Sequence, residues 1–405
     1  MKKTVSVVFA LVFVLSLVFA QGATDDGSYA GVTNKGYRPS DSNYYDGLNY
    51  SLFRNPSDFA TDRLRIQGVL GSSSFNFSNA IQNRSVAESF SHLTKFHWDK
   101  KNWINYVLGL ATEVGSGNND IISADFSVGA QVGNYGFGIN VTVDAKSMPM
   151  IDENAGAGQS NNSILGNGYL PVVDAALSFG YGTRVVNTSS MTLDVGATIH
   201  FSEKLYMLQL NLDTASDLIN KTRGFENLQS RSGLAMPLDI AATLGFMDQR
   251  LTVSAMLNNI NGYYYMRTYD NIGDAASFNH GYGRYLLYTP WTFSTSVVYN
   301  PRLGNYNPVM SLEFTDINLF FSNELEKESP MLEFFKYVNA SVKFDIHNIV
   351  SLKAAYKYGY PKFGLSVAYR GNQIDFIYGF HEAGSVYGEK PVDSLTFRMK
   401  FGVDK

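Results

Sequence analysis

Alternation of apolar and polar residues over long segments is the feature that most constrains how this chain can fold. Near the C-terminus, Leu395, Phe397 and Met399 alternate with Thr396 and Arg398. Successive side chains of a β-strand point to opposite faces, so this period of two predicts a strand with one apolar and one polar face. The same alternation recurs at 122–132, 135–143, 191–201, 251–257, 310–314, 338–346, 350–358, 363–369 and 374–380. The sequence therefore predicts an all-β fold.

Strands of about ten residues with charges on one face are typical of a transmembrane β-barrel, whose apolar positions face lipid and whose polar positions face an enclosed interior. Lys343 and Lys353 are such charges. A soluble β-sandwich would also alternate, but with shorter strands and with its polar face toward solvent. We predict a transmembrane antiparallel β-barrel of about 14 strands with an N-terminal lumen plug.

Composition excludes several other classes of protein. The chain has 405 residues, six histidines and no cysteine, so it can form neither disulfides nor thiolate metal sites. After the N-terminus, no apolar run approaches the roughly 20 residues that a spanning helix needs, which excludes a polytopic helical transporter. The histidines show no metal-ligand spacing, and we expect neither a metal nor another cofactor.

The N-terminus, residues 1–20, has the pattern of a secretory signal peptide. Lys2 and Lys3 form a positive start, residues 5–19 are apolar apart from Ser16, and Ala20 is a small residue at the cleavage point. Cleavage leaves 30 basic side chains against 36 acidic ones, a balance that argues against nucleic-acid binding. We expect export to the bacterial outer membrane.

Connection lengths support a barrel. Counting back from the C-terminal strand, the long connections fall on one side, at 147–170, 203–235, 263–290, 319–336 and 382–392. The short connections fall on the other side, at 133–134, 184–189, 247–249, 301–306, 347–348 and 371–372, while 359–361 is a short connection on the long side. Outer-membrane barrels segregate short periplasmic turns from long outer loops in this way.

The first strand decides the total count. Counting back through these connections gives thirteen strands from Ile121 onward, and an even number requires one more. Residues 64–77 are the best candidate, which makes 79–118 an insertion, outside or in the lumen, where Val86, Phe90 and Leu93 have the spacing of an amphipathic helix. Alternatively, 103–114 is a strand, and the barrel has fourteen or sixteen strands according to whether the chain before it also pairs.

The mature N-terminus, residues 21–61, shows no alternation and is rich in Gly, Ser, Asn, Asp and Tyr. We therefore do not expect it to form part of the barrel wall. Just ahead of the first predicted strand it contains Asn55-Pro56-Ser57. This segment resembles the Asn-Pro-Ala motif in the lumen plug of the FadL-like family of hydrophobic-compound transporters and the related spirochaete UPF0164-type proteins, although Ser57 departs from that motif. The order of signal, plug, strands and long loops is similar as well.

The resemblance implies a pore blocked by the plug, with apolar ligands entering between the outer loops and leaving sideways through a gap in the wall. Physically, Pro56 fixes a bend and Asn55 can hydrogen-bond its own backbone. The alternative is a simple turn into the first strand.

We therefore expect passive passage of small hydrophobic or amphipathic molecules such as long-chain fatty acids. The partners would be outer-membrane lipid, the solute, and the outer-membrane barrel assembly machinery during insertion. A general diffusion porin, and a surface protein whose loops bind a partner, are the alternatives.

Basic residues collect on the polar face of the C-terminal strands, in an otherwise acidic protein. They are Lys343, Lys353, Lys357, Lys362, Arg370, Arg398 and Lys400, against only Asp345 and Asp375. Such a lumenal wall could attract an anionic head group, because charges act more strongly in a low-dielectric cavity than in water. Alternatively, these cations pair with plug carboxylates at positions 25, 26, 41, 46 and 58.

Two further groups of residues are candidates for a site. Tyr263 to Tyr265, with further tyrosines at 282, 285 and 288 and Trp291, predict either an apolar ligand groove in an outer loop or an aromatic girdle at the membrane interface. His200 shares a strand face with Asp194, but six residues of strand separate them by about 20 Å, too far for a catalytic hydrogen bond. We expect no enzyme activity.

Overall fold

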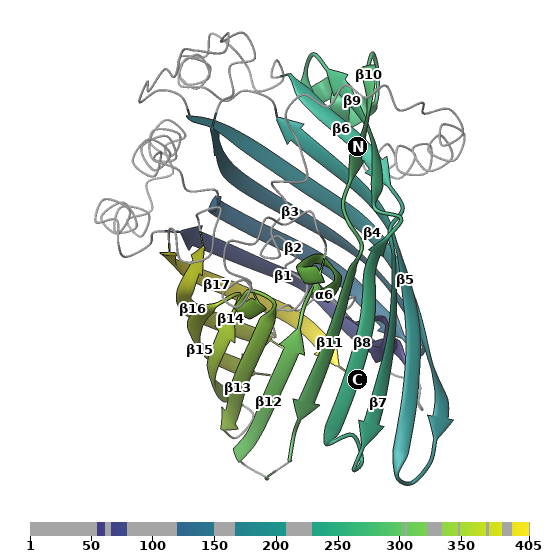
Figure 1. The fold of residues 1–405 in the computed structure, drawn as a ribbon, viewed down its shortest axis with the longest axis vertical. Helices are drawn as coiled ribbons and strands as arrows, with labels where there is room; N and C mark the ends of the chain where they lie inside the picture. Colours follow the sequence, from purple (N-terminus) through teal and green to yellow (C-terminus); the bar gives the residue numbers. More distant parts are fainter. Residues whose placement is uncertain are drawn as a thin grey trace.

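The computed structural model describes residues 55–60, 66–78, 120–149, 167–207, 229–301, 303, 306–321, 334–346, 349–369, 372–382 and 391–404. The predicted signal peptide, most of the predicted plug and the 79–118 insertion lie outside these residues. The described chain is mainly antiparallel sheet, with a 3-10 helix η4 (Pro56–Phe59) and helices α5 (Ile272–Ser277) and α6 (Ile317–Phe321) (Figure 1). No described helix combines the length and the apolar character needed to cross a membrane.

Seventeen strands lie in the described part of the chain, and fourteen of them pair in a ring. Strand β1 pairs with β2 on one side and with β17 on the other, so the first and last strands are joined. From β2 the antiparallel ladder continues through β3, β4, β5, β7, β8 and β11, and then from β12 in order to β17. The ring strands are β1 (Ile66–Ser78), β2 (Asp120–Val132), β3 (Tyr135–Pro149), β4 (Asn167–Asn187), β5 (Met191–Met207), β7 (Leu238–Phe246), β8 (Leu251–Ile260), β11 (Thr292–Tyr299), β12 (Tyr306–Phe314), β13 (Val338–Ile346), β14 (Val350–Lys357), β15 (Tyr360–Tyr369), β16 (Asn372–Glu382) and β17 (Pro391–Asp404).

This cyclic order of antiparallel pairs is that of a β-barrel, and it confirms the predicted strand number. The predicted first strand at 64–77 is confirmed as β1, which pairs along most of its length with both neighbours. The alternative strand at 103–114 lies outside the described residues.

Three more strands form a small outer sheet. These are β6 (Ser230–Ala235), β9 (Tyr263–Tyr269) and β10 (Tyr282–Tyr288), and they project beyond one end of the ring strands (Figure 1). Strand β6 pairs with the end of β5 and with β9, and β9 pairs with β10. The predicted long connection at 263–290 therefore joins the ring strands β8 and β11, but it is ordered as β9, α5 and β10. The alternation failed there because aromatic residues occupy both faces of β9.

Short connections join the ring strands at the end opposite the outer sheet. The β2–β3 turn contains Gly133 with φ 57°, and the β7–β8 turn holds Met247, Asp248 and Gln249 with φ between 53° and 61°. Such left-handed residues let consecutive strands reverse within two or three residues. The predicted segregation of short and long connections holds in the described residues, although β5 and β6 shorten the predicted 203–235 connection to 208–229.

The two faces of the ring differ as the alternation predicted. On β15, Phe363 is 59% exposed whereas Ser366 is 1% exposed, and on β16 the exposed Phe376 follows Asp375, which is fully buried. Among the described residues, 25 polar or charged side chains are buried, against 11 hydrophobic ones. A water-soluble protein buries mainly apolar side chains. The ring thus has a polar inner face and an apolar outer face.

Candidate functional site: the docked N-terminal segment and the charged wall

Residues 55–60, the described part of the predicted plug, lie against the inner faces of β4, β5 and β7. Asn55 caps η4, because its side-chain oxygen accepts a hydrogen bond of 3.0 Å from the backbone N–H of Ser57. Pro56 follows at the first helical positions, where its missing N–H costs nothing. The predicted local roles of Asn55 and Pro56 are therefore both present, and Pro56, Ser57 and Phe59 are buried.

Hydrogen bonds tie this segment to the wall at Thr243 of β7. The Thr243 hydroxyl lies 2.7 Å from the Ser57 hydroxyl and accepts a 3.3 Å hydrogen bond from the Asn55 amide. Thr243 also lies 2.8 Å from the hydroxyl of Ser254 on β8. Ser57, the departure from the Asn-Pro-Ala pattern, thus contributes a hydroxyl that alanine lacks, and this hydroxyl links the segment to β7 and, through Thr243, to β8.

Phe59 is the apolar anchor of the segment and is 1% exposed. Its ring lies over Gly136 of β3 and Gly180 of β4, and a methyl group on either glycine would overlap with it. The Gln131 amide of β2 donates a 3.3 Å hydrogen bond to the Phe59 carbonyl. A bulky ring can approach the strand backbones this closely only because two glycines leave room for it.

Two further glycines receive the backbone of the segment. Gly182 of β4 lies against the backbone of Phe59 and Ala60, and Gly196 of β5 lies against the carbonyl of Pro56. We call Gly136, Gly180, Gly182 and Gly196 the glycine socket. The sequence analysis missed the socket, although Gly136 and Gly138, and Gly180 and Gly182, repeat at the strand period of two.

The socket lies near the ring end with the short turns. The Gly182 N–H donates a 3.0 Å hydrogen bond to the carbonyl of Asn134, which is in the β2–β3 turn. The docked segment therefore occupies the interior face at the end opposite the outer sheet.

Two lysines of the predicted basic wall bind carboxylates of the wall itself. Lys353 lies 3.3 Å from Asp375, and their side chains are 11% and 0% exposed. Lys343 lies 2.8 Å from Asp345, with 37% and 14% exposed. The first pair is shielded from water and the second is not. Of the plug carboxylates suggested as partners, all but Asp58 lie outside the described residues.

The remaining basic residues have different settings. Lys357 and Arg398 are buried on the inner face of β14 and β17. Lys357 also places its ammonium group 4.9 Å from the centre of the Tyr358 ring. Lys400 is in β17, opposite Gln373 in the ladder. Arg370 lies outside the described residues.

A buried polar chain that the sequence analysis missed crosses the opposite wall. His200 of β5 binds Ser178 of β4 at 2.7 Å and Asp239 of β7 at 3.0 Å, and all three are buried. Asp194, the partner tested from sequence, instead binds Arg184 at 2.6 Å. The true partners of His200 lie 22 and 39 residues away along the chain, so only strand pairing brings them together.

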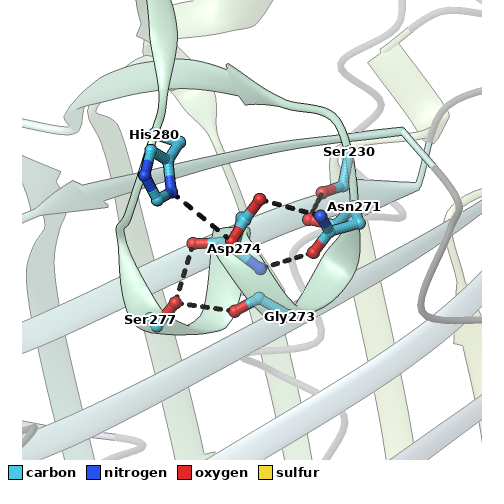
Figure 2. Close-up of polar contacts among 6 residues, drawn as sticks. All are labelled: Ser230, Asn271, Gly273, Asp274, Ser277 and His280. Carbon is cyan, nitrogen blue, oxygen red and sulfur yellow. Dashed lines mark hydrogen bonds and ion pairs between the residues drawn. The ribbon is translucent and has the colours of Figure 1, made fainter.

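The tyrosine-rich segment forms the outer sheet. Tyr263 of β9 stacks on Tyr288 of β10 with ring centres 4.6 Å apart. Figure 2 shows the tip, where the Asn271 side chain accepts a 2.7 Å hydrogen bond from the Asp274 N–H and so caps α5. His280 lies 3.8 Å from Asp274. Tyr264 is buried while Tyr263 and Tyr265 are exposed, so the strand presents one covered and one open aromatic face.

Neither a protein-family model nor a curated protein matches this sequence. Similar solved structures include the toluene transporter TodX of Pseudomonas putida, at 12% identity over 88% of this chain and 93% of that one, with a TM-score of 0.38. A FadL homologue of Pseudomonas aeruginosa is 11% identical over 87% and 93%, with a TM-score of 0.37. The translocator domain of the autotransporter NalP of Neisseria meningitidis is 10% identical over 92% and 99%, with a TM-score of 0.39. Likenesses this weak do not assign a function.

Proposed function

We propose that this chain is an outer-membrane β-barrel channel that passes small hydrophobic or amphipathic molecules, such as long-chain fatty acids, without an energy source. The observation that carries the proposal is the polar inner face of a strand ring, on which the chain's own segment 55–60 is docked. The apolar outer face suits contact with outer-membrane lipid. Export through cleavage of residues 1–20 and insertion by the barrel assembly machinery belong to the same proposal.

Residues 21–61 would act as the plug, with 55–60 as its anchor. An obstructed interior favours a selective channel over a general diffusion porin, whose lumen is open to small polar solutes. The basic wall of Lys343, Lys353, Lys357, Arg398, Lys400 and Arg370 would bind a carboxylate head group. Its buried cations act in a low-dielectric setting, where attraction for an anion is stronger than in water.

Purified protein in liposomes tests the choice of solute. We expect uptake of a labelled long-chain fatty acid and little swelling in small sugars. Free sugar permeation would indicate a porin. An absence of both, with retained binding of an envelope or host component, would indicate a surface-interaction protein. Comparing a fatty acid with its methyl ester tests the basic wall, because only the acid carries the charge.

A disulfide tests whether the anchor moves during passage. The chain has no cysteine, so any effect of oxidation on Ser57→Cys/Thr243→Cys belongs to that pair. If passage requires release of 55–60, oxidation will stop uptake and a reductant will restore it. The matched control is Ser311→Cys/Ser341→Cys, whose hydroxyls are 2.6 Å apart across β12 and β13. Equal uptake by both oxidised variants would show that the anchor stays in place.

A further inference from the structure

The chain bends where the outer sheet meets the ring. Strands β6 and β7 are separated at Pro237, β8 and β9 at Asn261, and β10 and β11 at Pro290. The ladder places these breaks beside one another, because Leu238 pairs with Ile260 and Asn258 pairs with Thr292. Proline cannot donate a ladder hydrogen bond, so the wall needs other contacts at this level.

Asn259 supplies such contacts from the β8 side. Its backbone is left-handed, with φ 57°, and its amide donates hydrogen bonds to the carbonyls of Thr289 at 2.8 Å and Pro290 at 3.1 Å. Its backbone N–H donates a 2.7 Å bond to Asp239, whose other carboxylate oxygen binds His200. Asn259 is thereby fixed to the polar chain of the wall.

Asn318 of α6 supplies contacts from the opposite side. Its amide donates a 2.7 Å hydrogen bond to the carbonyl of Trp291, and its side-chain oxygen accepts a 2.8 Å bond from the N–H of Phe293. Strand β12 pairs with β11 only from Thr295 to Tyr299. Residues 291–293 therefore lie beyond the part of β11 that pairs with β12. The side-chain amide of Asn318 makes the hydrogen bonds there that a backbone peptide of a neighbouring strand would make.

We propose that Asn259 and Asn318 form a two-sided clasp on residues 289–293, and that the clasp fixes the outer sheet relative to the ring. Asn259 donates to two carbonyls of this segment, whereas Asn318 both donates and accepts, as a neighbouring strand would. The clasp consists of hydrogen bonds within the chain and involves no solute. The proposal is therefore independent of the proposed transport.

Distances between spin labels test the clasp in the folded protein. Tyr265→Cys in the outer sheet and Met310→Cys on β12 are both exposed sites in a cysteine-free chain. Double electron–electron resonance should give a narrow distribution of the distance between the two labels in the parent protein. Adding Asn259→Ala and Asn318→Ala should widen it about twofold or more, because the outer sheet loses its fixed position. Asn318→Asp keeps the acceptor but loses the donor, and should give an intermediate width.

Two controls separate the clasp from general loosening. Labels at Met310→Cys and Leu365→Cys report on the ring alone and should keep their width. Asn140→Ala removes an inner-face amide that bonds Thr142, away from the bend, and should change neither distribution. Gel mobility before and after heating checks that the barrel is folded. If the alanine variant does not fold, Asn318→Asp carries the test. A distribution as narrow as that of Asn140→Ala would overturn the proposal.

Discussion

Two parts of the inner wall make their contacts with different kinds of residue. The wall of β3, β4 and β5 has glycines where its inner face meets Phe59 and Pro56, so its surface is shaped to receive a segment of the chain. The wall of β13 to β17 has long charged side chains that bind one another, such as Lys353 and Asp375. The contacts of the first wall depend on shape, and those of the second wall depend on charge.

The difference is physical. A glycine removes the side chain and lets another backbone or a ring approach closely, so the contact depends on fit and is insensitive to salt. A lysine–carboxylate pair on an enclosed face depends on how far water is excluded, and its worth varies with exposure. The docked segment is therefore retained at one wall by fit, while ion pairs stabilise the other wall.

The largest effect is expected from Gly196→Val. The added side chain would overlap with the backbone of Pro56 and Ser57, so 55–60 should leave the socket. A single cysteine at Ser57, buried in the parent, should then react rapidly with a maleimide. Gly364→Ala on the charged wall is the control, because its new methyl would meet atoms no nearer than 3.4 Å. Slow labelling in both variants would argue against docking by shape.

Phe59→Ala should weaken docking by about 3–5 kcal/mol, because a buried aromatic side chain is removed and the glycines leave a cavity. Labelling of the cysteine at Ser57 should speed up about a hundredfold or more, by the usual conversion of free energy into population. Phe376→Ala, an exposed ring on the outer face of β16, should leave that rate as in the parent. An unchanged rate in Phe59→Ala would assign the docking to Thr243 instead.

Lys353→Met should lower the free energy of unfolding by about 3 kcal/mol, because the buried carboxylate of Asp375 loses its ion pair and keeps the 2.9 Å hydrogen bond from the Gln373 amide. Urea unfolding in the presence of lipid vesicles measures this loss. The double variant Lys353→Met/Asp375→Leu should recover much of the stability, since both charges of this pair are then removed together. A double variant as unstable as the single one would show that the pair is not the relevant contact.

Lys343→Gln should have the smallest effect, below about 1 kcal/mol, because the lysine of this pair is partly exposed and screened by water. The same unfolding assay applies. A loss as large as that of Lys353→Met would mean that exposure does not distinguish the two pairs, and the comparison within the charged wall would fail.

Prediction from sequence succeeded where a single strand carries its own signal. Alternation located the C-terminal strands, the requirement for an even number of strands pointed to β1, and Asn55 caps η4 through its own side chain. It failed at β9, where tyrosines on both faces conceal the period of two. It also missed His200 with Ser178 and Asp239, because nothing local marks partners on different strands.

The sequence by itself determined that the chain forms long strands with one apolar and one polar face, because side-chain direction in a strand depends only on odd or even position. Only the tertiary structure decided which polar groups meet. Strand register brings Gly136, Gly180 and Gly196 under one segment and sets Lys353 beside Asp375. Register follows from the pairing of neighbours around the ring, and no single strand contains that information.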